Sequence, residues 1–286
     1  MSAAPDIIDR VIATYYQAAE LNQATPARQG NVVVLDHEVA DEVMITADLH
    51  GNRLNFNRLI KLADLENETR RHLIMQEVCH GGPTYPSGGC MSHLMLEDVA
   101  RLKTTYPRQF HFLLSNHELA ELTDFPISKN RRVLNLLFRC GLQEMYGPAA
   151  ESVREAAMVF LRSLPLAVRC GQTFISHSLP AQVDRWGFDL GVFDRPFTDD
   201  DLAAEGAAFQ LVWGRDFRLE NAEAFARLVE AELLIHGHEP CPDGFSTPNT
   251  RQVILDSATD RACYVTLRPG EKNSQKEVVD RIQRLL

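Results

Sequence analysis

The sequence predicts an α/β fold, and two observations support this prediction. Short apolar runs of strand-like composition alternate with longer runs whose apolar residues recur at the spacing of one helix face. Between residues 43 and 75 a strand, a helix and a second strand follow one another, an order that favours parallel strands joined by a right-handed crossover. Polar residues that follow adjacent parallel strands meet in one crevice. The order of the elements therefore predicts the position of a site as well as the fold class.

The predicted elements can be placed along the whole chain. We expect strands at residues 32–35, 43–47, 73–75, 110–114, 166–168, 173–176, 233–235, 253–255 and 262–267. We expect helices at residues 7–21, from 52 onward, at 94–106, over most of 119–146, at 149–162 and at 222–232. The last two strands are expected to pair with each other, residues 181–205 to form an irregular acidic loop, and residues 272–286 to form a terminal helix or a frayed tail.

The domain organisation is predicted to be simple. The 286 residues are enough for one large α/β domain, and the chain contains no internal repeat and no stretch typical of a linker. We therefore expect a single domain over residues 1–286. Its motif-bearing core runs from about residue 43 to residue 267, with the helix at 7–21 and the tail at 272–286 at the periphery.

Composition and charge exclude some classes of function. The formal net charge of −10 argues against a nucleic-acid backbone as the main partner, because phosphate contacts require an excess of Lys and Arg. The six cysteines are scattered and include no C-x-x-C pair, which favours reduced thiols and a cytoplasmic location. The first twelve residues lack the apolar run of a signal peptide or membrane anchor. We therefore expect no association with a membrane.

The stretch V-M-I-T-A-D-L-H-G-N at residues 43–52 combines a strand, two polar side chains and the start of a helix. Side chains alternate between the faces of a strand, so Asp48 and His50 share one side and can bind the same ion. Gly51 allows a tight turn, and Asn52 opens an amphipathic run. A surface turn that contains D-x-H by chance is the alternative interpretation of this stretch taken alone.

Five predicted strands end in residues of metal-binding type. One histidine after a strand is more often structural, and it is the repetition that indicates a shared site. Mixed oxygen and imidazole ligands suit Mn²⁺, Fe or Zn²⁺ better than Ca²⁺. Six ligands suit two divalent ions, with Mn²⁺ as the first choice, since two metals about 3.5 to 4 Å apart share a bridging carboxylate, clamp a phosphoester and activate a hydroxide. The candidate ligands are Asp48, His50, Glu77, Asn116, His177 and His238.

The local sequences around these ligands form an ordered set of motifs. The chain reads A-D-L-H-G at 47–51, S-N-H-E at 115–118, H-S-L-P at 177–180 and G-H-E-P at 237–240. In this order they resemble the motifs of the calcineurin-like metallophosphoesterases, and within them the phosphoprotein phosphatase (PPP) branch. The resemblance extends from about residue 43 to residue 267. It implies a four-layer αββα sandwich, in which two mixed β-sheets are flanked by helices.

The resemblance also implies a role for each motif residue. One ion would be held by Asp48 and His50, and the second by Asn116, His177 and His238, with Glu77 as the bridge.

Other motif residues would act on the substrate. His117 would lie near the phosphate and protonate the leaving oxygen as the catalytic acid, while Glu118 would support the catalytic loop. Asn116 would also face the substrate. Arg215, which follows Trp213 and Gly214, would bind two phosphate oxygens through its guanidinium fork. An arginine near a tryptophan is also a common packing pair, so a structural role is the alternative for Arg215.

The second motif departs from the family pattern. The family has G-D-x-x-D-R-G, whereas this chain has Q-E-V-C-H-G-G at residues 76–82. Glu77 replaces the bridging Asp, and its extra methylene predicts a looser site. His80 replaces the Asp that orients the catalytic His, and it is interpreted as an orienting residue, an extra ligand or a loop histidine. Gly81 replaces a phosphate-binding Arg.

Together these observations favour metal-dependent hydrolysis of a phosphomonoester or phosphoanhydride by solvent hydroxide. Two alternatives stay open. The degenerate second motif is compatible with a catalytically impaired metallophosphoesterase-like protein that acts as a binding module, and a dinucleoside polyphosphate hydrolase would differ only in its pocket. The phosphorylated substrate could be a phosphoprotein, a nucleotide or a small molecule.

Overall fold

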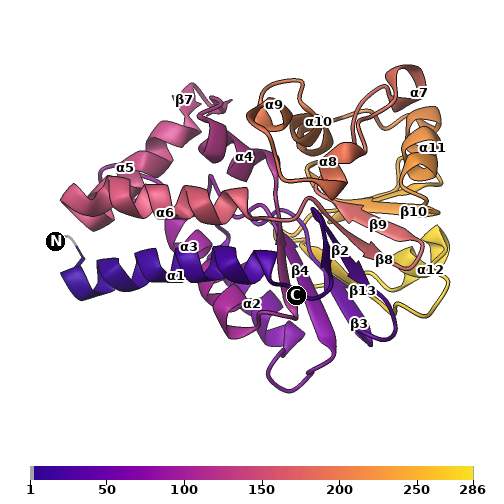
Figure 1. The fold of residues 1–286 in the computed structure, drawn as a ribbon, viewed down its shortest axis with the longest axis horizontal. Coiled ribbons are helices and arrows are strands. Elements are labelled where there is room, and N and C mark those ends of the chain that lie inside the picture. The colour runs from indigo at the N-terminus through magenta and orange to yellow at the C-terminus, as the bar shows by residue number, and fades with distance from the viewer. Residues whose placement is uncertain (1–2, 286) are drawn as a thin grey trace.

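The computed structural model describes residues 3–285, and its centre consists of two β-sheets with helices on their outer faces (Figure 1). The larger sheet has the strand order β1 (Arg28–Gln29), β2 (Val32–Leu35), β8 (Ala167–Cys170), β9 (Thr173–Ser176), β10 (Leu233–His236), β12 (Gln252–Leu255) and β11 (Phe245–Ser246). The smaller sheet has the order β14 (Gln283–Arg284), β13 (Cys263–Leu267), β3 (Glu42–Ile45), β4 (Arg71–Gln76) and β5 (Phe110–Leu113). A separate hairpin joins β6 (Ser128–Lys129) to β7 (Arg132–Val133).

Both large sheets are mixed, but the strands that lead to the site are parallel. In the smaller sheet β4 pairs in parallel with β3 and β5, so that Ile74 lies opposite Ile45 and His111. In the larger sheet β10 pairs in parallel with β9 and β12, whereas β8 and β9 are antiparallel. The crossover predicted for residues 43–75 is therefore confirmed as a parallel pair joined by a helix.

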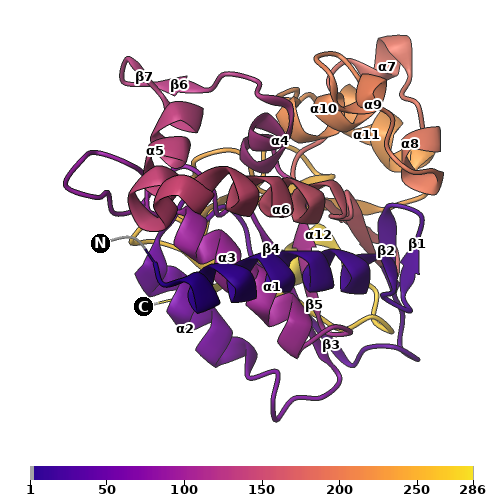
Figure 2. The same cartoon turned by 60° about the vertical axis from the view of Figure 1, so that its left-hand side comes forward.

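The helices form the two outer layers. They are α1 (Pro5–Gln23), α2 (Arg53–Ala63), α3 (His93–Thr105), α4 (Asn116–Thr123), α5 (Leu134–Tyr146), α6 (Ala150–Arg162), α7 (Val183–Trp186), α8 (Gly191–Asp194), α9 (Asp199–Leu202), α10 (Ala207–Trp213), α11 (Leu219–Leu228) and α12 (Gln275–Asp280). α1 runs beside α3 and α6 (Figure 2). α2 and α3 contact the smaller sheet, and α11 contacts the larger one.

Alternation of side chains along the strands builds the layers. On β3, Ile45 points into a core between the two sheets, whereas Met44 points into the core beneath the helices. On β9, Ile175 and Phe174 divide in the same way between the inner and the outer core. Because successive residues of a strand face opposite sides, an all-apolar strand can fill two cores at once. The predicted four-layer αββα sandwich is therefore confirmed.

Two predicted neighbours are not paired. β12 pairs with β10 and β11, whereas β13 pairs with β3 and β14 in the other sheet. The connection between them is shaped by its own polar contacts. The Asp256 carboxylate accepts from the N–H groups of Cys241 and Ala258, and the Ser257 hydroxyl donates to the Cys263 carbonyl. The prediction of a closing strand pair was wrong because these bonds carry the chain from one sheet to the other.

Two other segments differ from the prediction. The expected irregular loop at 181–205 contains the short helices α7, α8 and α9. The run at 119–146 is not continuously helical, because α4 ends at Thr123, followed by Asp124 in the left-handed conformation (φ 57°), and the β6–β7 hairpin precedes α5. Pro126 then disfavours helical backbone at Phe125. The tail contains α12 and β14, so it is ordered up to the last described residues.

Within residues 3–285, no helix has both the length and the apolar character needed to span a bilayer.

Candidate metal centre and active site

Five parallel strand ends bring the predicted ligands together. β3, β4 and β5 precede Asp48, Glu77 and Asn116, and β9 and β10 precede His177 and His238. Parallel strands place their carboxyl ends at one edge of a sheet, and ligand sites of α/β proteins form at such edges. The two sheets pack face to face, so their loops meet. The sequence-based prediction that these side chains converge agrees with the structure.

The innermost cluster, here called the inner group, consists of Glu77, His177 and His238. His177 Nε2 lies 3.0 Å from Glu77 Oε2 and 3.2 Å from His238 Nδ1. The side-chain oxygen of Asn116 lies 2.7 Å from His177 Nε2 and 3.1 Å from His238 Nδ1. All four residues are buried. Residues separated by up to 161 positions therefore present four ligand-type side chains to one point.

The hydrogen bonds around His177 direct its Nε2 at this point. Gln76 Nε2 donates to the Thr46 carbonyl at 3.1 Å, so Gln76 Oε1 accepts from His177 Nδ1 at 2.9 Å. A neutral His177 then has no proton on Nε2. Among residues 3–285, the buried Glu77 Oε2 and His238 Nε2 have no hydrogen-bond partner. Buried acceptors without donors are costly, and a cation satisfies them, so this donor set fits a divalent ion.

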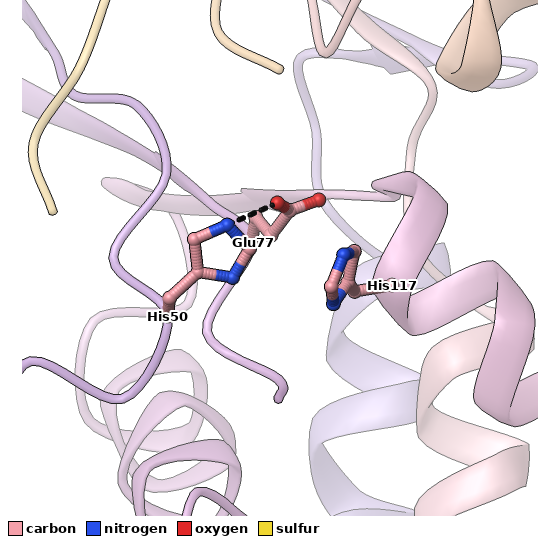
Figure 3. Close-up of side chains that lie close together, drawn as sticks. All are labelled: His50, Glu77 and His117. Atoms are coloured by element: carbon pink, nitrogen blue, oxygen red, sulfur yellow. Dashed lines mark ion pairs between the residues drawn. The ribbon is translucent and has the colours of Figure 1, made fainter. Parts of the chain in front are cut away.

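A second cluster, the outer group, consists of His50, Glu77 and His117. His50 Nε2 lies 3.0 Å from Glu77 Oε1, and the two histidine rings lie on either side of the carboxylate with centroids 4.8 Å apart (Figure 3). Glu77 therefore directs Oε1 to the outer group and Oε2 to the inner group. This arrangement is the one a bridging carboxylate requires. Burial of His50 disfavours its protonated form, but the nearby Glu77 carboxylate outweighs this and raises the pKa of His50 to about 10.

Glycines let the loops that carry His50 and Glu77 approach each other. A Cβ on Gly51 would lie 2.5 Å from the Gly81 carbonyl oxygen, and a Cβ on Gly82 would lie 2.3 Å from that of Gly51. The N–H groups of Leu49 and His50 both donate to the Glu77 carbonyl. The glycines are therefore needed for close packing of the backbone, which fixes His50 relative to Glu77.

Several site residues have left-handed backbone conformations. The φ angles are 44° for His50, 47° for Glu77, 62° for His80 and 68° for His238. Non-glycine residues adopt this conformation rarely, and each instance costs about 1 to 3 kcal/mol unless the surroundings enforce it. The concentration of such residues within five positions of the ends of strands β3, β4 and β10 is typical of a functional site.

Asp48 lies beside the inner group. Its Oδ1 accepts from the His238 N–H at 2.9 Å and lies 3.8 Å from His177 Nδ1. Gly237 makes this approach possible, because a Cβ there would lie 2.4 Å from Asp48 Oδ1. Burial, with a contribution from Glu77, raises the pKa of Asp48 to about 7. The implied pairing of Asp48 with His50 on one ion stays a prediction, since the outer group forms around His50 without Asp48.

His80 contacts His117. His80 Nδ1 lies 2.9 Å from His117 Nδ1, and His80 Nε2 lies 2.6 Å from Glu121 Oε1. The side chains of His80 and Glu121 are fully buried. Of the three interpretations of His80, this geometry matches a residue that orients His117. The Glu121 carboxylate contacts His80 and not His117 itself. Burial lowers the pKa of His117 to about 3, which the charge of Glu77 only partly opposes.

Glu118 holds the second motif in place. Its Oε1 accepts from the N–H groups of Val78 at 2.9 Å and Cys79 at 2.8 Å, while the Ser115 hydroxyl donates to Oε2. The side chain is fully buried. These contacts agree with the implied support of the loop, and a direct catalytic role of Glu118 stays a prediction.

Arg215 lies at the rim of the site. It follows α10, is exposed, and forms an ion pair with Glu239, the residue after His238. The Trp213 ring packs edge-on against the His238 ring at a centroid distance of 6.2 Å. Among the described residues, Arg215 has Glu239 as its ion-pair partner. The phosphate-binding role of Arg215 stays a prediction.

Two residues of this site were not identified from the sequence. Gln76 orients His177, and its signal was a polar side chain at the end of an otherwise apolar strand. Glu121 contacts His80, and its signal was the spacing of four residues after His117, which places both on one face of a helix. Both signals are common in proteins, and only the spatial contacts distinguish these two residues.

Comparison with known proteins gives similarity at the level of structure. No family model matches the chain, and no curated protein matches it in sequence. A serine/threonine phosphatase from Saccharomyces cerevisiae, described as similar to human phosphatase PP5, superposes with a TM-score of 0.69 at 15% identity, over 96% of this chain and 88% of its own. A cold-active protein-tyrosine phosphatase of a psychrophilic Shewanella species superposes with a TM-score of 0.58 at 12% identity, over 87% of this chain and 79% of its own.

These similarities cover most of each chain, and they agree with the two mixed sheets and flanking helices described above. The strand ends of that sandwich carry the residues of the resembling motifs in the expected order. The chain therefore has a PPP-type phosphoesterase fold.

Proposed function

We propose that this protein is a metal-dependent phosphoesterase that hydrolyses a phosphomonoester or a phosphoanhydride. The observation that carries the proposal is the Glu77 carboxylate, whose two oxygens face His50 and His177 in two separate groups. The fold similarity to serine/threonine and tyrosine phosphatases supports hydrolysis of phosphoesters as the class of reaction. The substrate is proposed to be a phosphorylated molecule, whether protein, nucleotide or small metabolite.

The ligands of the proposed centre divide between two ions. Asp48 and His50 would hold the first, the inner group with Asn116 would hold the second, and Glu77 would bridge them. Bound divalent ions, with Mn²⁺ proposed first and Fe or Zn²⁺ as alternatives, would neutralise phosphate oxygens and lower the pKa of a water molecule. The chain contributes preorganisation, because Gln76 holds the His177 ring with Nε2 directed inward before an ion arrives.

His117 is proposed to give a proton to the leaving oxygen. Its Nδ1 is 2.9 Å from His80 Nδ1, so Nε2 is the nitrogen available for proton transfer. His80 and Glu121 would hold the ring in its working orientation. A neutral His117 must first take up a proton, and the negative charge of an arriving phosphate favours this uptake. Arg215 would leave Glu239 to bind the phosphate.

Metal content and hydrolysis test the proposal together. Elemental analysis of purified protein after Mn²⁺ loading should give about two equivalents per chain, with turnover of p-nitrophenyl phosphate that EDTA abolishes. His238→Ala should lose the inner ion, whereas His37→Ala, on an exposed turn, should behave as wild type. A wild-type stoichiometry near zero would contradict the proposal. Bound metal without turnover would favour the alternative of a metallophosphoesterase-like binding protein.

A further inference from the structure

A cavity of about 660 Å³ lies beside the outer group. His50 and His80 line one side of it, and the β6–β7 hairpin contributes Lys129, Asn130 and Arg132. The volume falls within the range of about 300 to 1,000 Å³ typical of sites for small molecules. It therefore has room for more than the phosphate that would react at the centre.

Gly81 of the second motif cannot supply a positive charge to this cavity. Gly81 lies where the resembling family has a phosphate-binding arginine. A Cβ on Gly81 would lie 2.2 Å from the carbonyl oxygen of His50, so no side chain fits there without moving the backbone. Gly81 and Gly82 form part of the cavity wall. Positive charge on this side of the site must come from another segment.

The hairpin supplies that charge in a defined geometry. Asn130 and Arg131 both have left-handed backbones, with φ of 52° and 62°, as the tight two-residue turn of a hairpin requires. Lys129 and Arg132 lie directly opposite each other across the turn. Like charges in this position repel and destabilise a hairpin. An anion bound between them removes that cost.

The hairpin is also anchored and its cations are free. The Asn135 side chain accepts from the Ile127 N–H and donates to the Ala120 carbonyl on α4, which ties the base of the hairpin to the helix that carries His117. Among the ion pairs of residues 3–285, none involves Lys129 or Arg132, and both are exposed. In a chain of net charge −10, unpaired cations that line a cavity indicate an anionic ligand.

We infer that Lys129 and Arg132 bind a second anionic group of the substrate, which makes the substrate a small phosphoester with two acidic groups, such as a bisphosphate. This inference rests on the proposed function, because it takes the reacting phosphate to lie at the metal centre. One phosphate lies beside His50 and His117, and the other lies in the cavity between Lys129 and Arg132.

The test compares two ligands that differ by one phosphate, fructose 1,6-bisphosphate and fructose 6-phosphate. Calorimetric titration in EDTA measures their dissociation constants without turnover. Initial rates with Mn²⁺ measure KM for the bisphosphate and for p-nitrophenyl phosphate. The variants are Lys129→Ala and Arg132→Ala. Arg131→Ala is the matched control, because Arg131 has the same charge on the same turn and does not line the cavity.

Lys129→Ala and Arg132→Ala should each weaken binding of the bisphosphate, and raise its KM, about tenfold, the effect of losing one charge-assisted hydrogen bond. Binding of fructose 6-phosphate and KM for p-nitrophenyl phosphate should change less than about twofold, as expected for screened surface charges. Arg131→Ala should resemble wild type in both assays. Equal losses for both sugar phosphates would overturn the inference, because the cations would then bind the reacting phosphate. An unchanged bisphosphate affinity, or an equal effect of Arg131→Ala, would also overturn it.

The two assays separate this inference from the proposed function. If Mn²⁺-loaded wild type does not turn over any phosphoester, while Arg132→Ala selectively loses affinity for the bisphosphate, the phosphoesterase proposal fails and the anion site stands. If p-nitrophenyl phosphate is hydrolysed normally and Lys129→Ala and Arg132→Ala show no selectivity between the sugar phosphates, the anion site fails and the phosphoesterase proposal stands.

Discussion

The inner and the outer group share Glu77 but are built differently. In the inner group the His177 side chain is fully buried, and Gln76 and Asn116 contact it. In the outer group 29% of the His50 side chain is exposed, and His50 lines the 660 Å³ cavity. A buried, hydrogen-bonded histidine loses little freedom when an ion binds, whereas an exposed one remains accessible to a substrate. The inner group is therefore suited to hold an ion firmly, and the outer group is suited to meet the substrate.

The largest expected effect comes from the residue that both groups share. Glu77→Ala should lose at least one of the two ions and abolish hydrolysis of p-nitrophenyl phosphate, because each group loses a carboxylate oxygen. Glu77→Asp should keep both ions, because the carboxylate is retained. The affinity for the outer ion should change with the reach of the shorter side chain. Elemental analysis and initial rates measure both effects. Wild-type metal content and rate in Glu77→Ala would show that Glu77 is not a ligand.

The second largest effect is expected at the proton donor of the outer group. His117→Asn should lower kcat by about 10² to 10⁴, the usual contribution of a general acid, while the inner ion stays bound. Glu121→Gln keeps the size of the side chain but removes its charge, and should lower kcat about tenfold through His80 with KM unchanged. Stopped assays of kcat and KM on metal-analysed protein distinguish these cases. If His117→Asn retains the wild-type kcat, another group protonates the leaving oxygen.

A smaller effect is expected at the rim next to the inner group. Arg215→Ala should raise KM about tenfold with little change in kcat if its guanidinium binds the phosphate in the ground state and the transition state alike. Glu239→Gln releases Arg215 from its ion pair and should lower KM. Steady-state kinetics of the two variants measure these changes. Reduced solubility or unfolding of Arg215→Ala, with normal kinetics of the soluble fraction, would indicate the packing role with Trp213.

The two groups should also differ in their contribution to stability. His177→Ala leaves the buried Gln76 Oε1 without its donor, which costs about 1 to 3 kcal/mol of unfolding free energy. His50→Ala removes the partner of Glu77 Oε1 at the edge of the cavity, where water can replace it, so at alkaline pH, where His50 is uncharged, it should cost less than about 1 kcal/mol. Urea unfolding in EDTA measures both values without metal binding. Equal losses in the two variants would remove the structural distinction between the inner and outer groups.

The groups should also differ in how the stability of the metal-free protein depends on pH. The pKa of His50 is raised to about 10, so its stabilisation is present below pH 6.5 and is lost as the pH rises toward 10. The pKa of His117 is lowered to about 3, so the folded state gains stability as the pH rises from 3 to 6.5. His50→Asn should flatten the alkaline fall and His117→Asn the acid rise. Urea midpoints between pH 3 and 10 test both slopes, and unchanged slopes would contradict them.

Much of the fold and of the inner group followed from the sequence. Alternating strands and helices predicted the α/β class, the motif resemblance implied the sandwich, and the polar residues that end five strands predicted which side chains meet. These predictions work because a strand end is a local feature, and because parallel strands place their carboxyl ends at one edge. The positions of Asp48, Glu77, Asn116, His177 and His238 depend on this local rule and on the order of elements in the chain.

The remaining features depend on contacts between distant segments, and only the tertiary structure decided them. β12 and β13 belong to different sheets because Asp256 and Ser257 direct the connection. Gln76 and Glu121 acquire their roles from His177 and His80, which lie 101 and 41 positions away. Lys129 and Arg132 line the cavity because a hairpin interrupts the expected helix. Periodicity and motif spacing report what a residue does within its own element, whereas these roles are set by the packing of one element against another.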